Sequence, residues 1–171
     1  MIQMELIKTN EDLIAVCKLI NKAKYITIDT EFIREKTYWS KLCLIQVCAN
    51  NLEIIIDPLE NNIDLTPFIK ILNKKSILKV LHSGRQDIEI FYNISGKIPQ
   101  PIFDTQIAYS LVGGEENIGY TSLVKKITKK ELSKRHQVSD WSQRPLSSKQ
   151  LQYAANDVRY LSKIYKILSN E

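Results

Sequence analysis

Two acidic residues interrupt the apolar segment ITIDTEFI at residues 26–33, and this combination constrains the fold more than any other feature of the chain. The β-branched residues of the segment predict a strand, in which alternate side chains point to the same face. Asp29 and Glu31 therefore share one face of an otherwise apolar strand. Like charges in a partly buried place raise one another's pKa and cost stability, unless a cation or hydrogen-bond donors lie against them. The segment predicts a binding partner that neutralises the two carboxylates.

The elements expected around this strand indicate an α/β domain with a mixed sheet. Hydrophobic periodicity and turn residues predict a helix, three strands and a helix, followed by strands that alternate with helices. The approximate ranges are a helix at 9–23, strands at 25–32, 41–49 and 52–58, a helix from 66, a strand at 76–82, a helix at 83–94, a strand and a helix within 101–112, and a helix at 147–168. The last helix has a clear start, because Ser147 and Gln150 match a capping box.

The composition is that of one soluble domain over residues 1–171, with 44% hydrophobic and 25% charged residues. Charged residues break every apolar run near the start of the chain. We therefore expect no secretory signal and no membrane-spanning segment, and we predict a cytoplasmic protein. Cys17, Cys43 and Cys48 are odd in number and form no C-x-x-C pair, which favours reduced, buried side chains over a zinc site.

The basic segment KKITKKELSKRH at residues 125–136 contributes much of the positive charge of a chain whose formal net charge is +5. We expect this segment to be helical. It is either a solvated helix face or a surface that holds a polyanionic backbone, and both interpretations fit its composition.

Further acids lie in or near predicted helices. Asp87 is expected in the first turn of a helix that follows a buried strand, which is where open α/β folds place their ligands. Tyr153 and Asp157 are four residues apart in the last helix and so share one face. Taken singly, Asp29 is explained as a turn cap, Asp87 as an acid favoured by the helix dipole and Asp157 as a solvated charge. Their joint occurrence, in this order along the chain, favours one shared site.

The motifs TIDTEF, KVLHSGRQDIEIF and YAANDV, with IDP, PIFDTQIA and DWSQRPLS between them, resemble the catalytic domain of ribonuclease D. That domain belongs to the DEDD group of 3′-to-5′ exonucleases, in the subgroup with a tyrosine in its third motif. The resemblance covers roughly residues 20–168. It implies a ribonuclease H-like fold, in which a mixed five-stranded sheet is flanked by helices on both faces.

The same resemblance implies a catalytic site. Asp29, Glu31, Asp87 and Asp157 would hold two divalent metal ions, Mg²⁺ or Mn²⁺, and Tyr153 would orient the attacking water. Hard cations prefer carboxylate oxygens, and two such ions about 4 Å apart can activate water and stabilise the leaving 3′-oxygen. The implied activity is hydrolysis at single-stranded 3′ ends with release of nucleoside 5′-monophosphates, in RNA 3′-end processing or turnover.

A second group of residues is expected to contact substrate. These are Phe32, Gln46, His82, Trp141 and Arg144. Phe32 would stack on the terminal base, although a place in the core fits it equally well. His82 and Trp141 fit structural roles as well as substrate contacts. Asp104 precedes a predicted helix, so we interpret it as a helix cap and not as a metal ligand.

One departure from the family concerns length. Larger ribonuclease D proteins continue into helical nucleic-acid-binding domains, whereas this chain stops at Glu171, so we expect no appended helical domain. Affinity for single-stranded RNA 3′ ends, such as those of tRNA precursors, would then depend on the basic surface or on dimerisation. Two alternatives stay open, namely an exonuclease that acts on DNA and a non-catalytic RNA-binding module.

Overall fold

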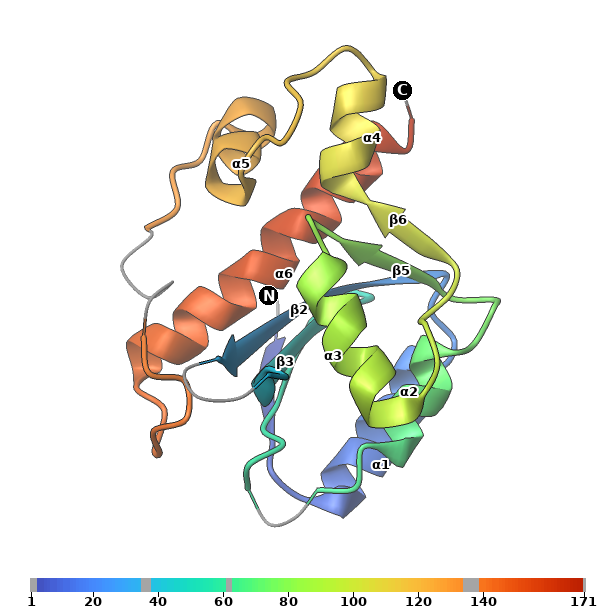
Figure 1. The fold of residues 1–171 in the computed structure, drawn as a ribbon, viewed down its shortest axis with the longest axis vertical. Helices are drawn as coiled ribbons and strands as arrows, with labels where there is room; N and C mark the ends of the chain where they lie inside the picture. Colours follow the sequence, from blue (N-terminus) through green and yellow to red (C-terminus); the bar gives the residue numbers. More distant parts are fainter. Residues whose placement is uncertain (1–2, 35–37, 61–62, 134–138, 171) are drawn as a thin grey trace.

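The core of the fold is a six-stranded mixed sheet (Figure 1), seen in a computed structural model that describes residues 3–34, 38–60, 63–133 and 139–170. Its strands are β1 (Gln3–Ile7), β2 (Tyr25–Ile33), β3 (Lys41–Ala49), β4 (Leu52–Ile56), β5 (Leu78–Leu81) and β6 (Ile102–Asp104). They lie in the order β1-β4-β3-β2-β5-β6. β3 runs antiparallel to both β2 and β4, and the remaining pairs are parallel. The predicted mixed α/β architecture is confirmed.

The sheet has one strand more than the five that were predicted. The additional strand is β1, which pairs in parallel with β4 at one edge of the sheet. An edge strand is hydrogen-bonded along one side, and its side chains need not all be covered. In β1 Met4 is exposed whereas Ile7 is buried. This partial burial explains why no clear hydrophobic pattern marked the strand in the sequence.

Helices cover both faces of the sheet, as the resemblance implied (Figure 1). They are α1 (Asn10–Ile20), α2 (Thr66–Leu72), α3 (Arg85–Ser95), α4 (Thr105–Leu111), α5 (Tyr120–Thr128) and α6 (Ser148–Leu168). Apolar side chains of α1, α2 and α3 join those of the central strands in one cluster on one face. On the other face Ala154 and Ala155 of α6 pack against Leu44 and Ile55. The small alanine side chains allow α6 to approach the sheet closely.

Two polar contacts fix the position of α6 over the sheet. Thr27 Oγ1 on β2 donates a 2.8 Å hydrogen bond to the backbone carbonyl of Val158. Arg159 forms an ion pair with Glu53 of β4, whose side chain is fully buried, and Nη2 lies 2.7 Å from Oε2. Leaving Glu53 without this cation would cost several kcal/mol, because a buried charge needs a partner. These contacts set where the third motif meets the first.

Side-chain caps mark the starts of α1 and α6. The Thr9 side chain accepts a hydrogen bond from the backbone of Asp12 and caps α1. Ser147 and Gln150 form the predicted capping box at the start of α6. Such caps satisfy backbone groups that the helix itself leaves unpaired.

The basic segment is helical only as far as the end of α5 at residue 128. Two of its lysines form ion pairs on the surface, Lys125 with Glu131 at 2.6 Å and Lys126 with Glu115 at 2.7 Å. Residues 134–136 of the segment lie outside the described residues. The prediction that this segment is helical is confirmed for residues 125–128 and wrong for residues 129–133, because the chain leaves the helix after residue 128.

The burial predicted for the cysteines is confirmed. Cys17, Cys43 and Cys48 are buried and have free thiols. Within the described residues, no helix combines the length and the hydrophobicity that crossing a membrane would require.

Candidate active site

The first two acids lie on the face of β2 that α6 covers. Asp29 is the register partner of Gln46 on β3, and Glu31 is the partner of Leu44. The register shifts directly after Glu31, where a bulge interrupts the pairing. Bulges re-aim side chains and are common beside functional sites. The strand therefore presents both carboxylates together directly before the register shift.

The third motif brings a further acid to this pair. Asp157 projects from α6, and one carboxylate oxygen from each of Asp29, Glu31 and Asp157 lies within 4.8 Å of the others. The three line a pocket of about 200 Å³, to which Tyr153 also contributes. This arrangement joins two segments more than 120 positions apart in the sequence.

Asp87 stands at the edge of this group. It lies in the first turn of α3 and is only 7% exposed, and its Oδ1 accepts a 2.5 Å hydrogen bond from Thr30 Oγ1. Its oxygens are not among those that lie within 4.8 Å of one another. Its negative charge nevertheless adds to burial, the main cause, in raising the pKa of Asp29. Three of the four predicted acids thus line one pocket, and Asp87 lies behind Thr30 without lining it.

Burial raises the pKa of these carboxyl groups, and their mutual repulsion adds to the effect. Burial, followed by the charges of Asp157 and Asp87, raises the pKa of Glu31 to about 9. Burial raises the pKa of Asp157 to about 7, against a hydrogen bond from Tyr153 that lowers it. The pKa of Asp29 is raised well above its ordinary value. A cluster of oxygen donors that repel one another as anions fits a hard divalent cation, which would neutralise them.

Tyr153 lies beside the acids with its hydroxyl protonated. Burial and the charges of Asp157, Glu31 and Asp29 all raise the pKa of its phenol. Its ring is packed against Trp141, with the ring centroids 6.0 Å apart. A phenol held in this way can position a water molecule by hydrogen bonding, but it is a poor base at neutral pH.

Two of the predicted substrate contacts are interior residues, and a third, Arg144, is partly buried. Gln46 is fully buried, and Trp141 is only 1% exposed. Arg144 binds the buried carboxylate of Asp57 through two contacts of 2.6 Å, and its Nη2 donates to the backbone carbonyl of Cys43 at 2.9 Å. Arg144 thereby holds the loop before α6 against the sheet, and contact of these three residues with substrate stays a prediction.

His82 and Phe32 lie closer to the acids. His82 lines the acid pocket, and burial lowers its pKa. Its Nε2 lies 3.1 Å from the carbonyl oxygen of Ile118, so this nitrogen donates the hydrogen bond, and Nδ1 lies 3.0 Å from Thr105 Oγ1. The imidazole therefore has partners on both nitrogens. Phe32 is half-buried just after the register shift between β2 and β3, and its stacking on a base stays a prediction.

Asp104 acts as a cap, as interpreted from the sequence. Its Oδ1 accepts from the backbone N–H of Gln106 at 2.8 Å at the start of α4. The same carboxylate accepts from the backbone of Ser83 at 3.0 Å and of Gly84 at 2.9 Å. It thereby fixes the turn that leads into α3, which carries Asp87.

Two residues at the site were not expected from the sequence. Tyr120, at the start of α5, lines the acid pocket, and its hydroxyl donates a hydrogen bond to the backbone carbonyl of Asp157. Its ring centroid lies 5.4 Å from that of His82. Thr30 was overlooked although it separates Asp29 from Glu31 in the strand. Strand alternation already pointed its side chain to the opposite face, where α3 packs.

Comparison with known proteins places this site in a family. A family model described as a 3′-5′ exonuclease matches residues 4–171, which include all the acids above. The chain belongs to this 3′-5′ exonuclease family. The exonuclease domain is 45% identical over 168 residues to Ribonuclease D of Bartonella henselae, covering 98% of this chain and 41% of that protein.

Solved structures agree with this assignment. The exonuclease domain is similar to the crystal structure of Escherichia coli RNase D, an exoribonuclease involved in structured RNA processing, with a TM-score of 0.94 and 38% identity. The match covers 98% of this chain and 44% of that one. The Aedes aegypti Nibbler EXO domain shares the fold at a TM-score of 0.88 and 22% identity, with 98% of this chain and 88% of that one covered. The resemblance to ribonuclease D is confirmed, and the chain spans about two fifths of the curated relative's length.

Proposed function

We propose that this exonuclease domain hydrolyses single-stranded RNA from its 3′ end and releases nucleoside 5′-monophosphates, in RNA 3′-end processing or turnover. The observation that carries the proposal is the meeting of Asp29, Glu31 and Asp157 within 4.8 Å, with Tyr153 in the same pocket. Membership of the 3′-5′ exonuclease family supports the reaction class. The names of the relatives from Bartonella henselae and Escherichia coli support RNA as the substrate.

The acids suit a metal-dependent reaction. Asp29, Glu31 and Asp157 would hold the ions, with Asp87 as a further ligand, and their all-oxygen donor set favours Mg²⁺ or Mn²⁺. When bound, two divalent cations would offset the charge of the phosphate and favour ionisation of the attacking water. In their absence the raised pKa of Glu31 keeps this carboxyl protonated at neutral pH.

Tyr153 on α6 would position the attacking water. The protonated Tyr153 hydroxyl would orient the water for attack on the terminal phosphorus. As the water oxygen bonds to phosphorus, the bond between phosphorus and the 3′-oxygen of the preceding nucleotide breaks. The terminal nucleotide leaves with its 5′-phosphate, and the shortened strand keeps a 3′-hydroxyl.

A time course on 5′-labelled single-stranded RNA tests the proposal, with DNA of the same sequence beside it. Each strand is incubated with the protein in Mg²⁺, Mn²⁺ or EDTA, and Asp157→Asn serves as the inactive control. We expect a ladder that shortens from the 3′ end of RNA in either metal and no cleavage in EDTA. Faster cleavage of DNA would replace the RNA assignment with a DNA exonuclease, and binding without cleavage of either strand would indicate a binding module.

A further inference from the structure

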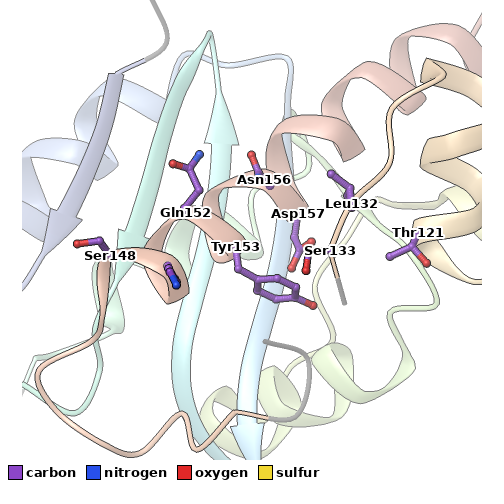
Figure 2. A pocket seen from close by; sticks show the side chains of 9 residues that line it. Thr121, Leu132, Ser133, Ser148, Gln152, Tyr153, Asn156 and Asp157 are labelled. Carbon is purple, nitrogen blue, oxygen red and sulfur yellow. The ribbon is translucent and has the colours of Figure 1, made fainter. Parts of the chain in front are cut away.

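A second cavity, of about 560 Å³, adjoins the acid pocket between α6 and the segment that follows α5 (Figure 2). Tyr153 and Asp157 line both cavities, so the two meet at the acids. We call the larger one the amide cavity, because Gln152 and Asn156 contribute side-chain amides to its wall. Figure 2 shows Tyr153 and Asp157 projecting toward the segment that carries Leu132.

The sizes of the two cavities suggest different occupants. The acid pocket, at about 200 Å³, is smaller than the range of roughly 300 to 1,000 Å³ that is typical of small-molecule sites. It has room for ions and a phosphate group. The amide cavity falls within that range, and it shares Tyr153 and Asp157 with the acid pocket, where the scissile phosphate would lie. It is therefore next to the groups attached to that phosphate.

The chemistry of the amide cavity suits a nucleobase. Lys149, Gln152 and Asn156 follow one another at spacings of three and four residues, so they share one face of α6. A side-chain amide carries both a donor and an acceptor, as the edges of nucleobases do. Leu132 adds an apolar surface for the face of a ring, and the exposed Lys149 can contact a backbone phosphate.

The orientation of Asn156 is fixed by a neighbour. Arg159 Nη1 donates to Asn156 Oδ1 at 3.3 Å, and Arg159 is itself held by Glu53. A guanidinium group can only donate, so the amide must turn its oxygen toward Arg159. The NH₂ group of Asn156 is therefore the group left to donate to a ligand. It fits an acceptor on a base edge, such as a carbonyl oxygen or a ring nitrogen.

We propose that the amide cavity binds an unstacked nucleobase of one of the two nucleotides that flank the scissile phosphate. Gln152 and Asn156 hydrogen-bond to the base edge, and Leu132 contacts the ring. The inference rests on the proposed function, since it assumes that a polynucleotide 3′ end occupies the acid pocket.

Binding of strands that lack single bases tests the inference. Labelled oligouridylate with phosphorothioates at its last three linkages is titrated in Ca²⁺, either intact or with one abasic ribose at one of the last four positions. The proteins are wild type, Gln152→Ala and Asn156→Ala. Asn93→Ala serves as the control, because it removes an exposed amide on α3 that does not line the cavity. Gln152 is also exposed, so its replacement leaves the core intact.

We expect Gln152→Ala and Asn156→Ala to weaken binding of the intact strand about three- to tenfold, as the loss of one hydrogen bond would. The loss should vanish for a strand that is abasic at one of the last two positions, because the base is then already missing. Three results would overturn the inference. The variants could lose the same affinity for every strand, lose none, or bind like wild type only when the abasic position is further from the end. Turnover of the unmodified strand by wild type is measured separately, so failure of the enzymatic proposal is distinguishable from failure of the base site.

Discussion

Thr30 Oγ1 donates a 2.5 Å hydrogen bond to Asp87 Oδ1, which joins the strand that carries the first two acids to the helix that carries the next. Burial raises the pKa of Asp87, and this hydrogen bond acts in the opposite direction. The contact therefore favours the ionised carboxylate in a place where Asp87 is only 7% exposed. Thr30, which lies between the proposed metal ligands Asp29 and Glu31, thus stabilises the ionised form of a third, Asp87.

Replacing Thr30 by Val should separate the effect of its hydrogen bond to Asp87 from the effect of its packing, because Val has a similar shape and no hydroxyl. The buried Asp87 carboxylate would lose a donor, at a cost of about 1–3 kcal/mol in the free energy of unfolding. Its pKa would rise further, so the pH at which turnover reaches half its maximum should move upward. Urea unfolding and a pH-rate profile measure the two effects, with Thr30→Ser as the control that keeps the hydroxyl. An unchanged profile would show that this bond does not tune the site.

Tyr120→Phe should slow turnover by placing Asp157 less accurately. The Tyr120 hydroxyl bonds to the backbone carbonyl of Asp157, so its loss affects a proposed metal ligand and not the RNA. We expect kcat to fall by about tenfold, as for other groups that support metal ligands, with KM for RNA little changed.

The matched control for this change is Tyr25→Phe. The hydroxyl of Tyr25 also contacts α6, through Ser162 Oγ at 3.0 Å, but Ser162 lies five positions beyond Asp157. The control should keep wild-type turnover. If both variants lose the same activity, general loosening of α6 explains the result and the positioning role of Tyr120 is lost.

Local periodicity predicted the parts of the site that lie within one element. Alternation in the strand put Asp29 beside Glu31, and helical spacing put Tyr153 beside Asp157. The hydrogen bond from Tyr120 to Asp157 crosses between two helices and is created by their packing, which no local pattern encodes.

Residue type alone does not distinguish substrate contacts from structural residues in the loop before α6. Trp and Arg are common at nucleic-acid surfaces, but they also fill cores and pair with buried acids. Burial separates these roles, and it follows from how the loop packs on the sheet. The structure buries Trp141 and pairs the partly buried Arg144 with Asp57, and contact of either residue with substrate stays a prediction.

Without metal, the free energy of unfolding should decrease as the pH rises from about 5 to 9. The pKa of Glu31 is raised from 4.5 to about 9 and that of Asp157 from 3.8 to about 7, so the folded state retains protons that the unfolded state releases. Stability is fully present below the ordinary pKa values and is lost as the pH rises through the raised ones. Thermal unfolding in EDTA at several pH values measures this decrease, and Glu31→Gln should flatten it between pH 7 and 9.

Adding Mg²⁺ should raise the melting temperature more at pH 8 than at pH 6. Metal binding requires the deprotonated carboxylates, so protons compete with it at the lower pH. The comparison uses the same protein with and without EDTA. A metal-induced shift that is equal at both pH values would argue against binding at these acids.

Asp157→Asn and Tyr153→Phe should have different effects on turnover and on metal binding. An amide is a poorer ligand for a hard cation, so Asp157→Asn should abolish turnover while the protein stays folded. Tyr153→Phe removes only the hydroxyl, so it should slow hydrolysis while metal-induced stabilisation persists. Initial rates on RNA and melting temperatures in Mg²⁺ distinguish the two. Near-normal activity of Asp157→Asn would reject the site assignment.

Arg144 offers a test of interior support against substrate contact. Arg144→Ala would leave the fully buried Asp57 carboxylate without its cation, and breaking such a buried pair costs about 3–5 kcal/mol. Asp57→Asn breaks the same pair from the other side. If Arg144 acts through Asp57, both variants should lose stability in urea, and the protein that remains folded should keep the wild-type KM for RNA. If KM increases for Arg144→Ala but not for Asp57→Asn, Arg144 contacts substrate directly.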